Sequence, residues 1–69
     1  MSEHVYELLE VTGSSPISSD TAVQIALNKA SCSVRNIEWF EVTEVRGHTD
    51  DVDILHWQVT LKVGFRVED

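Results

Sequence analysis

Residues 55–67, LHWQVTLKVGFRV, form the stretch around which the chain is organised. Every odd-numbered residue in it is apolar, and no even-numbered residue is a large hydrophobe. Because successive side chains of a strand point to opposite faces, this alternation predicts one long strand with an apolar and a polar face. A typical strand has only about five or six residues. So long a strand needs an apolar layer against its odd face and other strands to pair with its backbone.

The N-terminal half of the chain predicts a strand and then a helix. Residues 4–11, HVYELLEV, are expected to form a first strand, which the turn-forming run 12–16, TGSSP, ends. Residues 18–20, SSD, offer N-caps and a first-turn acid for a helix that Asn36 closes. Its apolar residues recur at helical spacing: Ala22, Val23, Ala26, Leu27, Ala30 and Val34. Much of this stripe is alanine, so a second backbone can approach closely, and we expect the helix to cover the odd face of the long strand. Ile25 falls off the stripe and is expected to be exposed, and contact with a second subunit is the alternative.

Residues 37–46 predict a second strand, and the polar run 47–53 a connection to the long strand. By alternation Phe40 and Val42 share one face, while Trp39 shares the other with Glu41, Thr43 and Val45. The same alternation puts Arg46 on the face of Phe40, unless a bulge beside Gly47 or a position at the strand end redirects it. The expected fold is therefore α+β, in the order strand, helix, strand, strand, with the last two strands in a hairpin.

Size and charge limit the classes of function. A chain of 69 residues makes one domain, spanning 1–69, and buries only about 60% of its unfolded surface, so association is the expected source of extra stability. Cys32 is the single cysteine, which excludes an internal disulfide. The net charge of −7 opposes nucleic-acid binding, and no apolar segment is long enough to span a membrane. A soluble cytoplasmic protein fits these features.

Two tryptophans and a glutamine are the residues of most interest. Trp57 lies on the apolar face of the long strand and is predicted to be a core residue. Trp39 lies on a mostly polar face, where it is an exposed residue, an oligomer contact or a platform for a ligand. Gln58 is expected on the same side of the sheet as Trp39; its carboxamide suits the edge of a heterocycle, and the alternative is a solvated strand residue.

Other polar residues give weaker signals. The basic side chains could hold an anionic group, or pair with surface carboxylates; they are Lys29, Arg35, Arg46, Lys62 and Arg66. Residues 50–53, DDVD, lack the spacing and the glycine of an EF-hand, so a solvated turn is expected. The three histidines have no helical metal spacing, and the serines lack a nucleophile elbow. With no nucleophile, base and oxyanion hole assembled, no enzymatic activity is expected.

Several stretches together resemble the dodecins, small flavin-binding proteins of bacteria and archaea. They are HVY at 4–6, GSSP at 13–16, RNIEWFEV at 35–42, RGH at 46–48 and QVTLKVGFR at 58–66. The resemblance covers nearly the whole chain. It implies a three-stranded antiparallel sheet curled around one helix, and twelve subunits assembled into a hollow shell of cubic symmetry.

The resemblance also implies a function and a site. Flavins would bind in pairs near twofold axes, stacked between Trp39 residues of symmetry-related subunits, with Gln58 bonding the pyrimidine edge of the isoalloxazine. Arg46 and Arg66 match arginines used towards the phosphate, which implies FMN rather than riboflavin or lumichrome as the ligand. Flavin storage and protection from light would be the role, and coenzyme A is a second ligand in some relatives.

The chain departs from the family pattern at several positions. Cys32 stands where relatives often carry a basic residue on the helix, which weakens coenzyme A binding, and His4 makes a phosphate contact there doubtful. Trp57 replaces the usual Tyr or Phe. Two alternatives to a flavin store remain open: an oligomer that is a structural or interaction module without flavin, and a binder of coenzyme A or another nucleotide that does not use Trp39.

Overall fold

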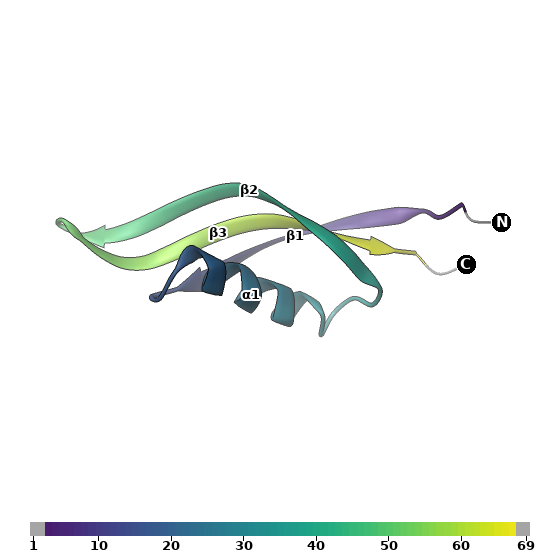
Figure 1. The fold of residues 1–69 in the computed structure, drawn as a ribbon, viewed down its shortest axis with the longest axis horizontal. Coiled ribbons are helices and arrows are strands. Elements are labelled where there is room, and N and C mark those ends of the chain that lie inside the picture. The colour runs from purple at the N-terminus through teal and green to yellow at the C-terminus, as the bar shows by residue number, and fades with distance from the viewer. Residues whose placement is uncertain (1–2, 68–69) are drawn as a thin grey trace.

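The computed structural model describes residues 3–67, and its elements follow the order β-α-β-β (Figure 1). They are β1 (Tyr6–Ser15), α1 (Ser19–Ala30), β2 (Ile37–Asp50) and β3 (Asp53–Arg66). The strands form one antiparallel sheet in the order β1-β3-β2, so the stretch that organises the sequence is the central strand. The predicted fold class is confirmed.

Helix α1 packs on one face of the sheet, against β1 and β3. Ser18 is its N-cap and accepts a hydrogen bond from the Thr21 backbone N–H at 3.0 Å, which satisfies one of the free N–H groups of the first turn. Three helical alanines and three residues of β3 form the buried core: Ala22, Ala26, Ala30, Val59, Leu61 and Val63. The alternation of β3 thus gives the core face as expected. No helix of the described residues is long and apolar enough to cross a membrane.

Gly13 lets the helix approach the sheet. A Cβ built at this position would lie 3.0 Å from the Ala26 Cβ and would clash with the Ala22 carbonyl oxygen. The run 12–16 was expected to end the first strand, but β1 continues through Ser15. The reason is that Gly13 serves here as a point of close packing rather than as a turn residue.

Three other predicted boundaries were wrong. The helix ends at Ala30 instead of continuing past Val34, and Asn36, with φ of 65°, lies in the connection that follows. Strand β2 runs on to Asp50, and the predicted connection shrinks to a tight turn at Asp51, whose φ is 62°. The long β2–β3 hairpin therefore extends well beyond the helix, at the left of Figure 1.

Trp57 was predicted to be a core residue, but it is only partly buried and lies outside the core cluster. Its neighbours on the flanking strands are Ser15, which has a small side chain, and Gly47, which has none, so they cannot enclose an indole. Ile25 is exposed, as expected.

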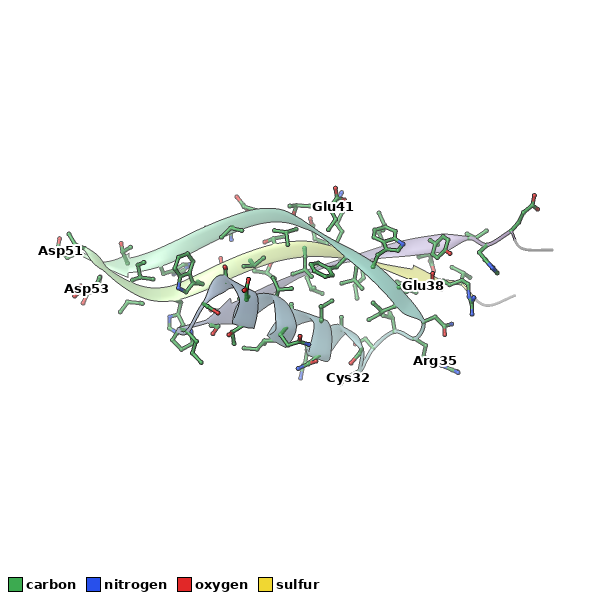
Figure 2. The ribbon with its side chains drawn as sticks, in the orientation of Figure 1. Cys32, Arg35, Glu38, Glu41, Asp51 and Asp53 are labelled. Carbon is green, nitrogen blue, oxygen red and sulfur yellow. The ribbon has the colours of Figure 1, made fainter. Side chains whose placement is uncertain are left out.

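The inner face of the sheet, on which the helix packs, also carries an apolar stripe on β2 that the helix leaves uncovered. Phe40, Val42 and Val45 lie opposite the core residues of β3, yet each is between 41% and 53% exposed. The helix covers β1 and β3 instead, so within one chain this stripe faces solvent. Figure 2 shows the sheet and the helix with the side chains drawn as sticks.

Candidate functional site

The four predicted site residues share the outer face of the sheet, opposite the helix. In the register of β2 and β3, Trp39 lies opposite Gly64 and Arg46 lies opposite Gln58. These positions alternate with the buried residues of β3, so their side chains point away from the core. Arg66, the last residue of β3, has the same parity.

A bulge in β2 brings Arg46 to this face. Val42 pairs with Leu61 and Glu44 pairs with Thr60, so Thr43 is an extra residue without a partner position. Strict alternation had put Arg46 on the inner face, and Val45 with Trp39 on the outer one. The bulge puts Arg46 on the outer face and Val45 on the inner one. It lies at Thr43 and not beside Gly47, where a bulge was considered.

Trp39 lies over Gly64. A Cβ built on Gly64 would overlap three contiguous ring atoms of the indole, Cδ2, Cε2 and Cζ2. The absence of a side chain at this position of the central strand is therefore what lets the indole rest on the sheet. Trp39 remains 42% exposed, so part of the aromatic surface is open to a ligand.

Beside this indole, at the C-terminal end of β3, Glu38 joins two other side chains. It accepts a hydrogen bond from the Tyr6 hydroxyl at 3.2 Å, and its second carboxylate oxygen lies 3.9 Å from the Arg66 Nη1. The pKa of the Tyr6 hydroxyl is raised, first by partial loss of hydration and then by the hydrogen bond and the negative charge of Glu38, while Arg66 lowers it. The contact of Arg66 with Glu38 is an exposed ion pair, which contributes little to stability and leaves the guanidinium able to change partner.

Gln58 and Arg46 form a second group further along the sheet. The Arg46 Nη1 donates to the Gln58 Oε1, and its Nη2 is paired with the Glu44 carboxylate. All three side chains project from the outer face of the hairpin. Sequence reasoning singled out Arg46 and Gln58 individually but missed their contact and the part of Glu44.

The two groups are far apart within one chain. Gly64, beneath Trp39, and Gln58 are six residues apart along β3, which corresponds to about 20 Å at the usual rise of a strand. The two side chains were expected on the same side of the sheet. They share a face, but one subunit alone cannot bring both to the same ring system.

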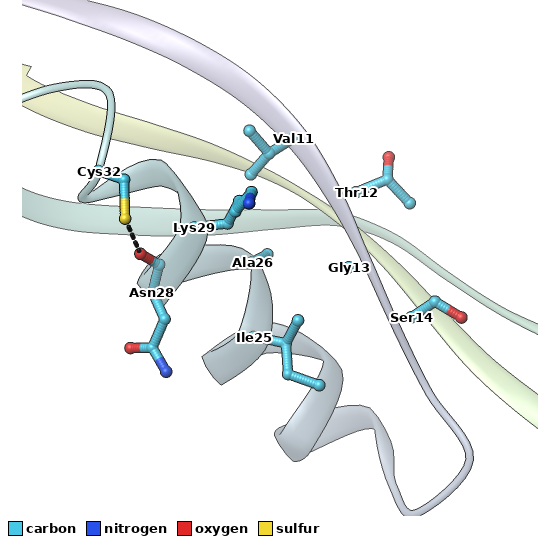
Figure 3. Close-up of a pocket in the computed structure, with 9 residues that line it drawn as sticks. All are labelled: Val11, Thr12, Gly13, Ser14, Ile25, Ala26, Asn28, Lys29 and Cys32. Carbon is cyan, nitrogen blue, oxygen red and sulfur yellow. Dashed lines mark hydrogen bonds between the residues drawn. The ribbon is translucent and has the colours of Figure 1, made fainter.

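A separate groove of about 770 Å³ lies between β1 and α1 (Figure 3). Its lining is mostly apolar, with Lys29 as the basic side chain, and the Cys32 thiol donates to the Asn28 carbonyl oxygen at 3.6 Å. None of the predicted site residues lines it. Among residues 3–67, no three His, Cys, Asp or Glu side chains are grouped so that they could hold a metal ion.

The fold and the outer face define a class: a small β-α-β-β chain whose curved antiparallel sheet presents an exposed tryptophan and an arginine–glutamine pair. Known proteins of this class are close in sequence and structure. The family model described as Dodecin matches residues 5–68. Dodecin of Thermus thermophilus is 40% identical over 65 residues, 94% of this chain and 94% of that protein.

Two solved structures agree with this match. Dodecin from Streptomyces coelicolor is 51% identical with a TM-score of 0.92, and covers 100% of this chain and 99% of its own. Dodecin from Streptomyces davaonensis is 47% identical with a TM-score of 0.93, and covers 99% of this chain and 100% of its own. This chain belongs to the dodecin family.

Proposed function

We propose that this protein binds flavin and stores it in a homo-oligomeric shell, without catalysing a reaction. The observation that carries the proposal is the Trp39 indole, which rests on Gly64 and is open to solvent on the outer face. A flat isoalloxazine stacked on such a ring buries apolar area, and each aromatic pair adds about 0.5–1.5 kcal/mol beyond that burial.

The pocket would be built between subunits. A twofold axis presents the same patch twice, so one Trp39 per chain can supply both walls of a sandwich around a pair of flavins. Because Gln58 is about 20 Å along the strand from this indole, the amide that meets the pyrimidine edge would come from a different subunit than the tryptophan beside it.

The open apolar stripe on β2 supports association. Phe40, Val42 and Val45 lie beside the core without cover from the helix, and a chain of 69 residues gains from burying them against a second copy. The proposed assembly is the hollow dodecamer, and light scattering of the purified protein would then give twelve times the mass of the chain.

Arg66 is the proposed partner for the phosphate of FMN. Its guanidinium is exposed, and Glu38 is a weak competitor at 3.9 Å. Arg46 is the second basic residue of the proposed site. FMN is accordingly the proposed ligand, ahead of riboflavin and lumichrome, and the cytoplasm is the proposed location. Competition between FMN and coenzyme A would test whether coenzyme A takes the same site.

Protection from light follows from the same stacking. An indole in contact with photoexcited flavin can donate one electron to it, and return of that electron restores both rings and dissipates the energy. Bound flavin should therefore lose its fluorescence, and strongly fluorescent bound flavin would contradict this part of the proposal.

The decisive experiment is a titration of apo-protein with FMN, followed by flavin fluorescence, for wild type and Trp39→Ala. We expect the variant to assemble normally and to lose binding. Trp57→Phe is the matched control, because Trp57 lies on the opposite face of the sheet, and it should bind as wild type does. Unchanged affinity in Trp39→Ala would refute the proposed platform.

A further inference from the structure

Arg46 already has two partners in the protein. It lies directly opposite Gln58 across the β2–β3 ladder, its Nη1 donates to the Gln58 Oε1, and its Nη2 is paired with Glu44. The fork geometry of a guanidinium allows these two contacts at once. The nearby carboxylate also offsets its positive charge, which makes Arg46 a poorer attractor of a phosphate than its residue type suggests.

The contact with Arg46 fixes the orientation of the Gln58 amide. A glutamine amide carries one acceptor oxygen and an NH₂ group with two donors, and rotation about its last torsion is nearly free between two orientations. With Oε1 held by Arg46, the Nε2 group points the other way and is available to donate. The pyrimidine edge of a flavin has two carbonyl oxygens flanking its N3–H, so a fixed Nε2 donor matches a carbonyl.

We propose that Arg46 is a positioning residue: it holds the Gln58 carboxamide so that Nε2 faces the ligand, and it does not contact the phosphate of FMN. This inference rests on the proposed function and assigns Arg46 a role different from the one that the family resemblance implied. Arg66 is eight residues from Gln58 along β3, about 26 Å, so the two arginines of one chain act at different places. Preference for FMN over riboflavin then depends on Arg66.

The test compares two ligands that differ only by the phosphate. Riboflavin and FMN are titrated into apo-protein for wild type, Arg46→Met, Gln58→Ala, the double variant and Arg66→Met. Fixing one side chain is worth about a two- to twelvefold change in affinity. We expect Arg46→Met to weaken both ligands by this factor with their ratio unchanged, whereas Arg66→Met should weaken FMN alone.

The double variant shows whether Arg46 acts through Gln58. Once the amide is gone there is nothing to orient, so Arg46→Met should change affinity less than twofold in the Gln58→Ala background. Arg46→Lys should restore part of the loss, since an ammonium can still donate to Oε1.

Three results would overturn the inference. They are a selective loss of FMN binding in Arg46→Met, an unchanged affinity for both flavins, and an equal effect of Arg46→Met with or without Gln58. A readout without ligand separates this inference from the proposed function: in apo-protein, the NMR order parameter of the Gln58 Nε2 should fall in Arg46→Met. If wild type bound no flavin, the proposed function and this role would both be wrong, and the NMR result would show only whether the contact orders the amide.

Discussion

Replacing Gly64 with alanine should weaken flavin binding while leaving the fold in place. The new Cβ would occupy the space now taken by the five- and six-membered rings of Trp39. The obstacle is a partly exposed side chain and not backbone, so the indole can swing away at little cost to the sheet. Gly64→Ala would thus displace the proposed platform without removing the tryptophan.

The expected loss of affinity follows from the stacking that is given up. Each indole–flavin pair contributes about 0.5–1.5 kcal/mol beyond area burial, and a flavin that also stacks on a second flavin has one such indole wall. At about 1.4 kcal/mol for each tenfold change, a displaced wall weakens binding roughly two- to twelvefold. Loss of the buried apolar area adds to this value, which makes it a lower limit.

Fluorescence titration with FMN measures the affinity, and thermal unfolding with light scattering measures the fold and the assembly. Gly47→Ala serves as the control, because a Cβ there meets only the His56 carbonyl oxygen, at an ordinary 3.7 Å. Wild-type affinity in Gly64→Ala would mean that flavin binding does not require the indole to pack on Gly64. The proposed position of the stacking platform would then be wrong.

Three further predictions concern stability and ionisation. Gly13→Ala should lower the free energy of unfolding by about 1–3 kcal/mol in urea titrations, because the added Cβ meets helix backbone, whereas Gly47→Ala should stay within about 0.5 kcal/mol of wild type. Trp57→Ala should cost less than the roughly 3–5 kcal/mol of a fully buried tryptophan when the chain is studied as a monomer, since the indole is only partly buried; a loss in that upper range would contradict the observed exposure. Tyr6 is the single tyrosine, so an absorbance titration should show its pKa above the ordinary 10.0, and Glu38→Gln should move it down. The raised pKa means that the folded state holds this proton more tightly, so the contribution of Tyr6 to stability is present at neutral pH and is lost as the pH rises above about 10.

Much of the fold could be predicted because β3 alternates without interruption. Leu61 and its odd-numbered neighbours identified the core face, and the spacing of Ala22 and Ala26 identified the helix that covers it. Gly13 was misleading, because a glycine that ends a strand and a glycine that admits a helix look alike in a single sequence. A long hairpin and a short one also differ only in how far the pairing continues, which the polar residues after Arg46 did not reveal.

The site was predicted by residue more successfully than by arrangement. Trp39 and Gln58 were correctly assigned to one face, because simple alternation along paired strands is enough to give this result. The bulge at Thr43 determines which face of the sheet Arg46 occupies, and no local feature of the sequence predicts this bulge. Gly64 did carry a usable signal, since a glycine inside a strand often marks a close approach, here that of the indole.

The wide separation of Trp39 and Gln58 along the β2–β3 hairpin has a consequence for how flavin would be released. Under the proposed function each chain carries both binding residues, but a single chain cannot bring the two into contact with the same flavin. Occupancy and assembly would therefore be linked: bound flavin would favour the assembled state, and dilution into free chains would release the ligand without any change in the individual subunit.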